Sequence, residues 1–249
     1  MDQDWDSIAP PGWTVRHAIE TGSTNDLAKA AGLAGASEKT LFVTDHQLKG
    51  RGRMDRTWVE LPGSSLLFSI LFRRPLPPIL LTMICSLAAC EAIQRVAGAR
   101  AEIKWPNDLM LNGRKLAGVL TEVNWSPENR FAVVGMGINV NFDPPLVEGI
   151  PDTATSLLRE TGTEASRREL LREILLSLDA LLAMENAALE PFVRDRWATR
   201  LWRRRQRVVV ADGGTVLEGI FEGVDSEGVL LLRLDDGTLT QVRVGDVVV

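Results

Sequence analysis

The chain has 249 residues, of which 45% are hydrophobic, and a formal net charge of −5. This length allows one large domain, or a large and a small one, around a sizeable buried core. The net acidity excludes a protein that binds nucleic acid through a broad basic surface, so any anion binding must be local.

The two cysteines, Cys85 and Cys90, lie inside an apolar run without the spacing of metal or redox sites. We expect both to be buried, reduced thiols. The N-terminal residues form no apolar signal segment, and we expect no stretch that reaches the roughly 18 residues needed to span a bilayer. A cytoplasmic protein without membrane contact is therefore the expectation.

The first elements alternate between strand and helix. Residues 14–20 alternate in polarity like a strand, and the spacing then becomes helical. Ser23, followed by Asp26, resembles a capping box and places the run Ser-Thr-Asn at the start of a helix. Residues 40–46 predict a second strand, which leads into a loop rich in glycine and arginine.

A long strand and a buried helix come next. Residues 64–72 predict a strand that crosses a sheet, and residues 77–98 predict a buried helix that ends at Gly98. After a proline turn, Asn112 and Gly113 join two apolar strands, which indicates a tight hairpin.

The hairpin places Lys115 just past its turn, on a strand. Residues 130–141 predict a further strand, interrupted by Gly135 and Gly137, where a backbone or a ligand can approach closely.

The last third of the chain changes character near residue 205. Residues 142–152 are loop-like, and Ser166 to Leu201 is helical, with a capping box at its start and Pro191 dividing two helices. The remaining strands are short and regularly spaced, which is typical of a small β-barrel. We therefore expect two domains, residues 1–205 and 206–249.

The loop GRGRMDRTW is the first candidate site. Gly50 and Gly52 allow successive N–H groups to converge on one anion, and Arg51, Arg53 and Arg56 can bind phosphate bidentately. We expect this loop to be mobile when empty and ordered over its ligand. A solvated surface turn is the alternative interpretation.

A second cationic site follows in the hairpin region. Lys115 on rigid backbone suits the neutralisation of charge in a transition state, although an exposed strand lysine would look the same. Lys104 begins the run KWPND, in which Asn107 and Asp108 supply an amide and a carboxylate; these could equally be turn residues. Asn139 lies in a strand, where asparagine is disfavoured unless its side chain is used.

Four segments together resemble one family, the biotin protein ligases. They are QLKGRGRMDRTW, KWPNDLM, KLAGVLTE and VVGMGINVN, with the run STN upstream and a small β domain downstream. The resemblance covers nearly the whole chain from about residue 14, in the order and spacing of the family.

The resemblance implies a fold and a reaction. The fold is α/β (α+β), with a mixed-sheet catalytic domain like that of class II aminoacyl-tRNA synthetases, followed by an SH3-like barrel. The reaction activates biotin with ATP and Mg²⁺ to biotinyl-5′-AMP and pyrophosphate. Biotin is then transferred to a lysine of the biotin carboxyl carrier protein, a subunit of acetyl-CoA carboxylase.

The resemblance also implies site residues and partners. Lys115 and Arg53 would be catalytic, and Asp108 and Asn139 would serve the metal. The implied substrate-binding residues are Ser23, Thr24, Asn25, Gln47, Gly50, Arg51, Gly52, Arg53, Arg56, Trp58, Lys104, Asn107, Lys115, Gly118 and Asn139. We expect the class that acts only as a ligase, with no DNA partner; members of the family form homodimers in some cases.

Two departures from the family pattern concern the same site. Met54 and Asp55 stand where the family loop usually has a variable residue and a glycine, so a negative charge lies near the expected phosphate. The chain ends GDVVV, without the arginine that often follows this motif in the family.

Two other functions compete with this interpretation. A lipoate or octanoate ligase or transferase would share the fold, but the runs GRGR and KLAG fit the biotin family better. A non-catalytic module that binds an anion or nucleic acid could use the same basic loop, but the net acidity and the second cation at Lys115 argue against it.

Overall fold

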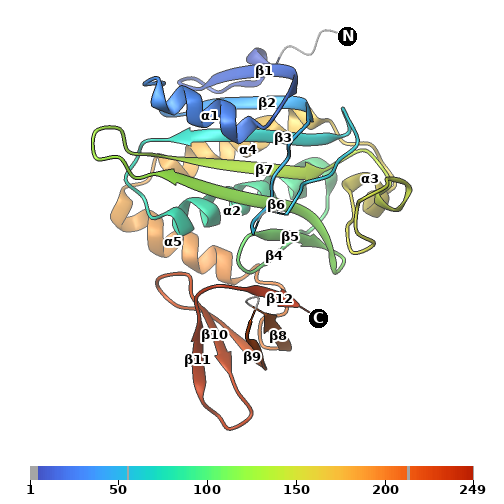
Figure 1. The fold of residues 1–249 in the computed structure, drawn as a ribbon, viewed down its shortest axis with the longest axis vertical. Helices are drawn as coiled ribbons and strands as arrows, with labels where there is room; N and C mark the ends of the chain where they lie inside the picture. Colours follow the sequence, from blue (N-terminus) through green and yellow to red (C-terminus); the bar gives the residue numbers. More distant parts are fainter. Residues whose placement is uncertain (1–4, 55, 212–213, 249) are drawn as a thin grey trace.

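The computed structural model describes residues 5–54, 56–211 and 214–248, so Asp55 lies outside the described residues. A mixed sheet of seven strands has the order β1-β2-β3-β7-β6-β5-β4, and a second sheet of five strands has the order β11-β10-β9-β8-β12 (Figure 1). The predicted fold class, a mixed α/β catalytic unit followed by a small β unit, is confirmed.

The larger sheet consists of β1 (Thr14–Thr21), β2 (Thr40–Gln47), β3 (Ser65–Phe72), β4 (Glu102–Lys104), β5 (Asp108–Leu111), β6 (Arg114–Asn124) and β7 (Phe131–Asn139). The smaller one consists of β8 (Arg207–Ala211), β9 (Val216–Val224), β10 (Leu230–Arg233), β11 (Leu239–Val242) and β12 (Asp246–Val248). The helices are η1 (Asp6–Ile8), α1 (Thr24–Leu33), α2 (Pro78–Ala97), η2 (Pro144–Leu146), α3 (Leu157–Thr161), α4 (Arg167–Leu182) and α5 (Asn186–Ala198).

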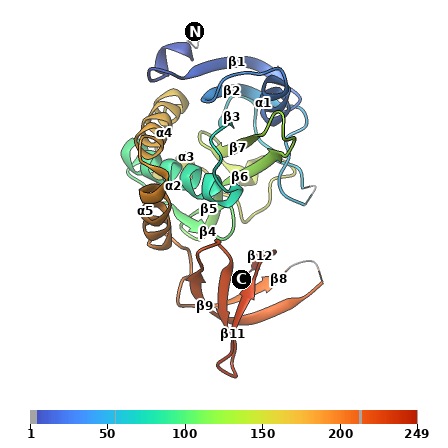
Figure 2. The same ribbon diagram turned by 90° about the vertical axis from the view of Figure 1, so that its left-hand side faces the viewer.

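The two faces of the larger sheet are covered differently (Figure 2). Helices α2, α4 and α5 lie together on one side, where Phe68, Ile70 and their neighbours join the main hydrophobic core. Helix α1 lies on the other side, where Ala28 packs with Leu71 in a smaller cluster. Because α1 covers only part of its face, the strands beyond it are free to form a site.

Helix α2 is the central helix of the core. It ends before Gly98, which adopts the left-handed conformation at φ 64° as predicted. Cys85 and Cys90 are both buried free thiols on this helix, and burial raises the pKa of Cys90 to about 12. By length and a mean hydropathy of 1.6, α2 could cross a membrane, which corrects the expectation of no such stretch, but 72% of that window is buried inside the protein.

The hairpin between β5 and β6 forms as predicted. Asn112 and Gly113 adopt positive φ values of 50° and 78°, the conformation of a type I′ turn. Lys115 then lies at the start of β6, where its backbone N–H donates to the Thr153 carbonyl at 2.8 Å. The backbone of Lys115 is therefore held on one side by its pairing with Met110 of β5 and on the other by Thr153.

Two local predictions about helices differ from the structure. Ser23 is the N-cap residue of α1, but its side chain makes no capping hydrogen bond; the Asp26 N–H donates to the Ser23 backbone carbonyl instead, at 3.1 Å. Pro191 lies inside α5 rather than between helices. It gives up one i→i−4 hydrogen bond, but Leu189 before it and Val193 and Trp197 after it are buried and hold both parts of the helix against the core. The capping box at Ser166 is confirmed, with Ser166 Oγ accepting from Glu169 N at 3.2 Å.

The smaller sheet is joined to the larger one by specific contacts. The indole N–H of the buried Trp105 donates to the Gly228 carbonyl at 2.9 Å. The Ile103 backbone, in β4, pairs with Arg200 and Trp202 in the segment that leads into β8. The smaller sheet therefore lies against the β4 end of the larger one, and the boundary near residue 205 remains a proposal.

We predict that Leu81→Ala, at a fully buried position of α2, lowers the free energy of unfolding by about 2 to 5 kcal/mol through lost burial and a residual cavity. Urea denaturation measures this change. The matched control is Leu176→Ala on α4, where 38% of the side chain is exposed, and its cost should stay below about 1 kcal/mol. Equal losses in the two variants would contradict the assignment of α2 as the core helix.

Candidate active site

A cavity of about 700 Å³ opens on the face of the larger sheet that α1 leaves uncovered. The predicted residues that line it are Ser23, Thr24, Asn25, Gln47, Arg51, Gly52, Arg53, Arg56, Trp58, Lys104, Asn107, Asp108, Lys115, Gly118 and Asn139. The structure therefore brings together side chains from α1, β2, the basic loop, and strands β4 to β7.

Other lining residues were not predicted as site residues, although the sequence marks Gly113 as a turn residue and Gly135 and Gly137 as points of close approach. They are Thr57, Val59, Met110, Gly113, Val119, Leu120, Gly135, Met136, Gly137, Gly149, Ile150, Pro151, Thr153, Ala154, Trp202, Asp246 and Val248. The two interrupting glycines of β7 were the signal for close approach. The run GDVVV includes Asp246 and Val248 but predicted no contact for either, and nothing local marked Trp202.

The basic loop forms a small hairpin over the cavity. Gly52 N–H donates to the Arg56 carbonyl at 2.6 Å, and Trp58 N–H donates to the Gly50 carbonyl at 3.0 Å. The Gly52 N–H is therefore already used, which corrects the predicted convergence of N–H groups on an anion. Gly50 does not line the cavity; a Cβ there would lie 2.7 Å from the Trp58 carbonyl oxygen, so the close approach of the two loop strands requires glycine.

Glycines form the floor beneath the loop. A Cβ added at Gly137 would lie 2.6 Å from Trp58 Cε2, and one at Gly118 would lie 3.2 Å from Trp58 Cζ3. The indole of Trp58 thus rests directly on β6 and β7, because these strands have no side chains there. Trp58 Nε1 is buried and has no hydrogen-bond partner among the described residues.

A polar cluster occupies the end of the cavity beside α1. Thr24 donates to Gln47 Oε1 from its backbone N–H at 2.8 Å and from its hydroxyl at 3.1 Å. Ser69 Oγ donates to Asn25 Oδ1 at 2.5 Å, and a Cβ at Gly135 would lie 2.0 Å from that same oxygen. These side chains hold one another in place before any ligand arrives.

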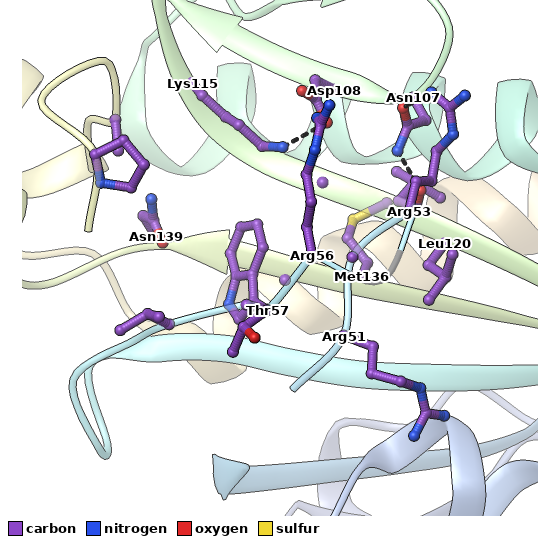
Figure 3. A pocket seen from close by; sticks show the side chains of 18 of the residues that line it. Arg51, Arg53, Arg56, Thr57, Asn107, Asp108, Lys115, Leu120, Met136 and Asn139 are labelled. Atoms are coloured by element: carbon purple, nitrogen blue, oxygen red, sulfur yellow. Dashed lines mark hydrogen bonds and ion pairs between the residues drawn. The ribbon is translucent and has the colours of Figure 1, made fainter. Parts of the chain in front are cut away.

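Arg51 turns away from the other loop cations and toward α1 (Figure 3). Its guanidinium donates to both carboxylate oxygens of Asp26, at 2.6 and 2.9 Å, and lies 3.7 Å from Glu122. This contact holds the pKa of Asp26 below its ordinary value of 3.8. The predicted contact of Arg51 with phosphate therefore competes with an existing ion pair at the rim of the cavity.

Lys115 is held at the opposite wall by a carboxylate and an aromatic ring. Its Nζ lies 2.8 Å from Asp108 Oδ1 and 5.8 Å from the centre of the Trp58 ring (Figure 3). The resemblance implied that Asp108 serves the metal; in the structure its carboxylate also orients Lys115. The lysine is aimed across the cavity floor rather than into bulk solvent.

Arg53 and Arg56 reach the same cavity from the loop. Arg53 NH1 donates to Asn107 Oδ1 at 3.0 Å and to Asp246 Oδ1 at 3.1 Å. Arg56 NH2 lies 2.7 Å from the other oxygen, Asp246 Oδ2. The two cationic groups predicted at separate places in the sequence, Arg53 and Lys115, therefore share one cavity.

Lys104 adds a further cation near the smaller sheet. Its Nζ lies 5.9 Å from the centre of the Trp202 ring. Burial lowers the pKa of Lys104, while the carboxylates of Asp108 and Asp246 oppose that shift. The cavity thus holds four cationic side chains against two carboxylates along this wall, a surplus of positive charge suited to an anion.

Two side chains of the cavity, Asn139 and Asp108, have oxygen atoms that could bind a magnesium ion together with substrate phosphates. Asn139 donates its amide N–H to the Thr155 carbonyl at 2.9 Å, while its buried Oδ1 has no hydrogen-bond partner in the described part of the chain. Asp108 contributes a carboxylate to the same cavity. Mg²⁺ is often bound by one or two such oxygens plus substrate phosphates. Within the described residues no cluster of three acidic, histidine or cysteine side chains could hold a metal alone.

Comparisons with known proteins cover both sheets. Residues 19–141 match the Biotin/lipoate A/B protein ligase family, and residues 206–249 match the Biotin protein ligase C terminal domain. The chain is 34% identical to the biotin–[acetyl-CoA-carboxylase] ligase of Paracoccus denitrificans over 226 residues, covering 86% of this chain and 91% of that protein. It is 31% identical to the ligase of that name from Mycobacterium tuberculosis, covering 96% of this chain and 91% of that protein.

A solved structure has the same overall arrangement. The biotin protein ligase from Aquifex aeolicus, in complex with biotin and ATP, superposes with a TM-score of 0.81 and 26% sequence identity. The match covers 94% of this chain and 97% of that one. The similarity therefore extends over the cavity and over the contact between the two sheets.

The ion pair between Asp26 and Arg51 predicts a pH-dependent contribution to stability. Because the folded pKa of Asp26 is lowered, its contribution is fully present above the unfolded pKa and is lost as the pH falls through the folded value. Urea denaturation should show Asp26→Asn less stable than the parent near neutral pH, with the difference vanishing in acid. An Arg51→Gln background should reduce this pH dependence to the smaller part that comes from Lys29, whose Nζ lies 3.5 Å from Asp26 Oδ1. A constant difference at all pH values would contradict it.

Proposed function

Because the chain belongs to the biotin protein ligases, we propose that it activates biotin with ATP and transfers it to a lysine of a biotin carboxyl carrier protein. In the first step the biotin carboxylate attacks the α-phosphorus of ATP, and pyrophosphate leaves. In the second, the amine of the carrier lysine attacks the carbonyl of the mixed anhydride, and AMP leaves. The carrier of acetyl-CoA carboxylase is the proposed acceptor, after the names of the two relatives.

The observation that carries this proposal is that Arg53 and Lys115 line one cavity. The first step brings a carboxylate toward a phosphate, so two anions must approach one another. Arg53 offers a planar fork and Lys115 a point charge for the oxygens of this centre. Both are already positioned by neighbours, so little reorganisation is needed when charge develops.

The remaining lining residues divide between the two substrates. The cluster of Thr24, Asn25 and Gln47 supplies fixed hydrogen-bonding groups at one end of the cavity, which suits the ureido group of biotin. Trp58 forms an apolar wall between this end and Lys115. Lys104 and Asn107 lie on the side of the smaller sheet, where we place the nucleotide.

Asp108 and Asn139 would hold a magnesium ion through their oxygen atoms, together with phosphate oxygens. The bound ion would supply neutralisation of phosphate charge in the first step. Asp108 also keeps Lys115 aimed at the cavity through their 2.8 Å ion pair, whether or not a metal is bound.

Location and partners are part of the same proposal. Two buried free thiols suit a reducing cytoplasm, which is the proposed location. The net charge of −5 argues against DNA as a partner, because DNA binding needs positive charge. Strand β1 is an edge of the larger sheet and exposes Ile19, so we propose this edge for pairing of two copies in a homodimer.

The exchange of pyrophosphate into ATP tests the proposed activity directly. Biotin, lipoate and octanoate are offered separately to the purified protein with Mg²⁺. We predict exchange with biotin alone, because the first step is reversible and needs the acid that fits the cavity. Exchange with lipoate or octanoate but not with biotin would contradict this prediction and identify a lipoate or octanoate ligase.

A substitution at Lys115 tests its role in the first step. We predict that Lys115→Ala slows biotin-dependent exchange by about 10² to 10³, the scale for loss of one preorganised charge. Arg114→Ala is the matched control, because this neighbouring cation is exposed and its guanidinium donates to the Asp152 backbone carbonyl outside the cavity lining. An unchanged rate in Lys115→Ala, or an equal loss in both variants, would remove Lys115 from this role.

A further inference from the structure

Asp246 is the carboxylate that the smaller sheet contributes to the cavity. One oxygen lies 3.1 Å from Arg53 NH1 and the other lies 2.7 Å from Arg56 NH2. Asp246 therefore bridges Arg53 and Arg56, whereas the third loop arginine, Arg51, pairs with Asp26. Without Asp246, two like charges on one short hairpin would repel each other.

The position of Asp246 is fixed by the smaller sheet. Strand β12 pairs antiparallel with β8, with Asp246 opposite Ala211. Gly245 precedes it with φ 141°, and a Cβ there would lie 2.9 Å from the Ala211 carbonyl oxygen. Val247, which follows, is 1% exposed. The carboxylate thus belongs to rigid backbone, while the arginines belong to a loop.

The geometry leaves both arginines able to bind a further anion. Arg53 contacts Asn107 and Asp246 through NH1 alone, and Arg56 contacts Asp246 through NH2, as far as the described residues go. A guanidinium has five N–H donors in a planar fork. Each arginine therefore keeps free donors, so a phosphate can join the carboxylate rather than replace it.

We infer that Asp246 is a positioning residue, which holds the basic loop closed over the cavity and presents Arg53 and Arg56 to the nucleotide phosphate. This inference rests on the proposed function for its substrate, but the closure itself is a property of the protein alone. The smaller sheet thereby acts in the first reaction step without touching the reacting atoms. Its contribution is to hold two arginines at the place where charge must be cancelled.

The closure can be tested without any substrate. Trypsin cleaves after arginine, so the hairpin itself offers three cleavage sites, at Arg51, Arg53 and Arg56. We predict that Asp246→Asn speeds cleavage within the loop about fivefold, the scale for losing one or two partly exposed ion pairs. Mass spectrometry of the fragments identifies the cut. The same cleavage rate in the variant and the parent would overturn the inference.

The matched control is Glu227→Gln, which removes an exposed ion pair with Arg243, at 3.0 Å, between two connections of the smaller sheet. It should leave the cleavage rate of the loop unchanged. A second variant, Arg56→Gln, guards against misfolding of the sheet: adding Asp246→Asn to it should speed cleavage by clearly less than in the parent. If Asp246→Asn speeds loop cleavage by the same factor in the Arg56→Gln background as in the parent, Asp246 does not act through Arg56.

Kinetics then test the role in the reaction. In pyrophosphate exchange we predict that Asp246→Asn raises the KM for ATP by about fivefold with a smaller change in kcat, since it disturbs binding geometry rather than chemistry. Asp246→Glu should restore part of the loss. A lower KM in Asp246→Asn would mean that the carboxylate competes with phosphate, and would overturn the inference. Absence of exchange in the parent protein would defeat the proposed function and leave the trypsin result standing.

Discussion

The arrangement depends on holding several positive side chains close together around one cavity. Lys115, Arg53 and Arg56 would repel one another in the empty protein, and each is instead paired with a carboxylate, Asp108 for the lysine and Asp246 for the two arginines. The pairs keep the cations in position without saturating their donors. The positive side chains are therefore in position before an anion binds. A chain with a net charge of −5 can in this way still present a locally positive site.

The fold supports this arrangement by leaving part of one sheet face bare. Helix α2 and its neighbours cover the opposite face, and the glycines of β6 and β7 make a flat floor on which Trp58 can lie. The basic loop crosses above that floor, and the smaller sheet meets its tip through Asp246. The cavity is thus made of parts from both sheets, and each of the two parts matches a domain of biotin protein ligases.

Motifs with a local mechanism could be predicted from the sequence, and tertiary contacts could not. Asn112 and Gly113 determine their own turn, and Gly98 determines the end of its helix. The four quoted motifs and the run STN identified the family and contain most of the residues that line the cavity. Asp246 lies in the run GDVVV, but that run alone predicted no contact for it, because its importance comes from arginines almost two hundred residues away. The helix break predicted at Pro191 was wrong because tertiary packing of Leu189, Val193 and Trp197 keeps the helix continuous across the proline. The use of the Gly52 N–H within the hairpin depends on loop geometry that the sequence pattern does not specify.

The account is tested most directly by a crystal structure of the protein with biotinyl-5′-AMP bound. It predicts donors of both Arg53 and Lys115 within about 3 Å of oxygens of the mixed anhydride, the ordinary range of a hydrogen bond. It would be contradicted by an adenylate whose anhydride contacts neither side chain, or by one bound outside the cavity between the two sheets.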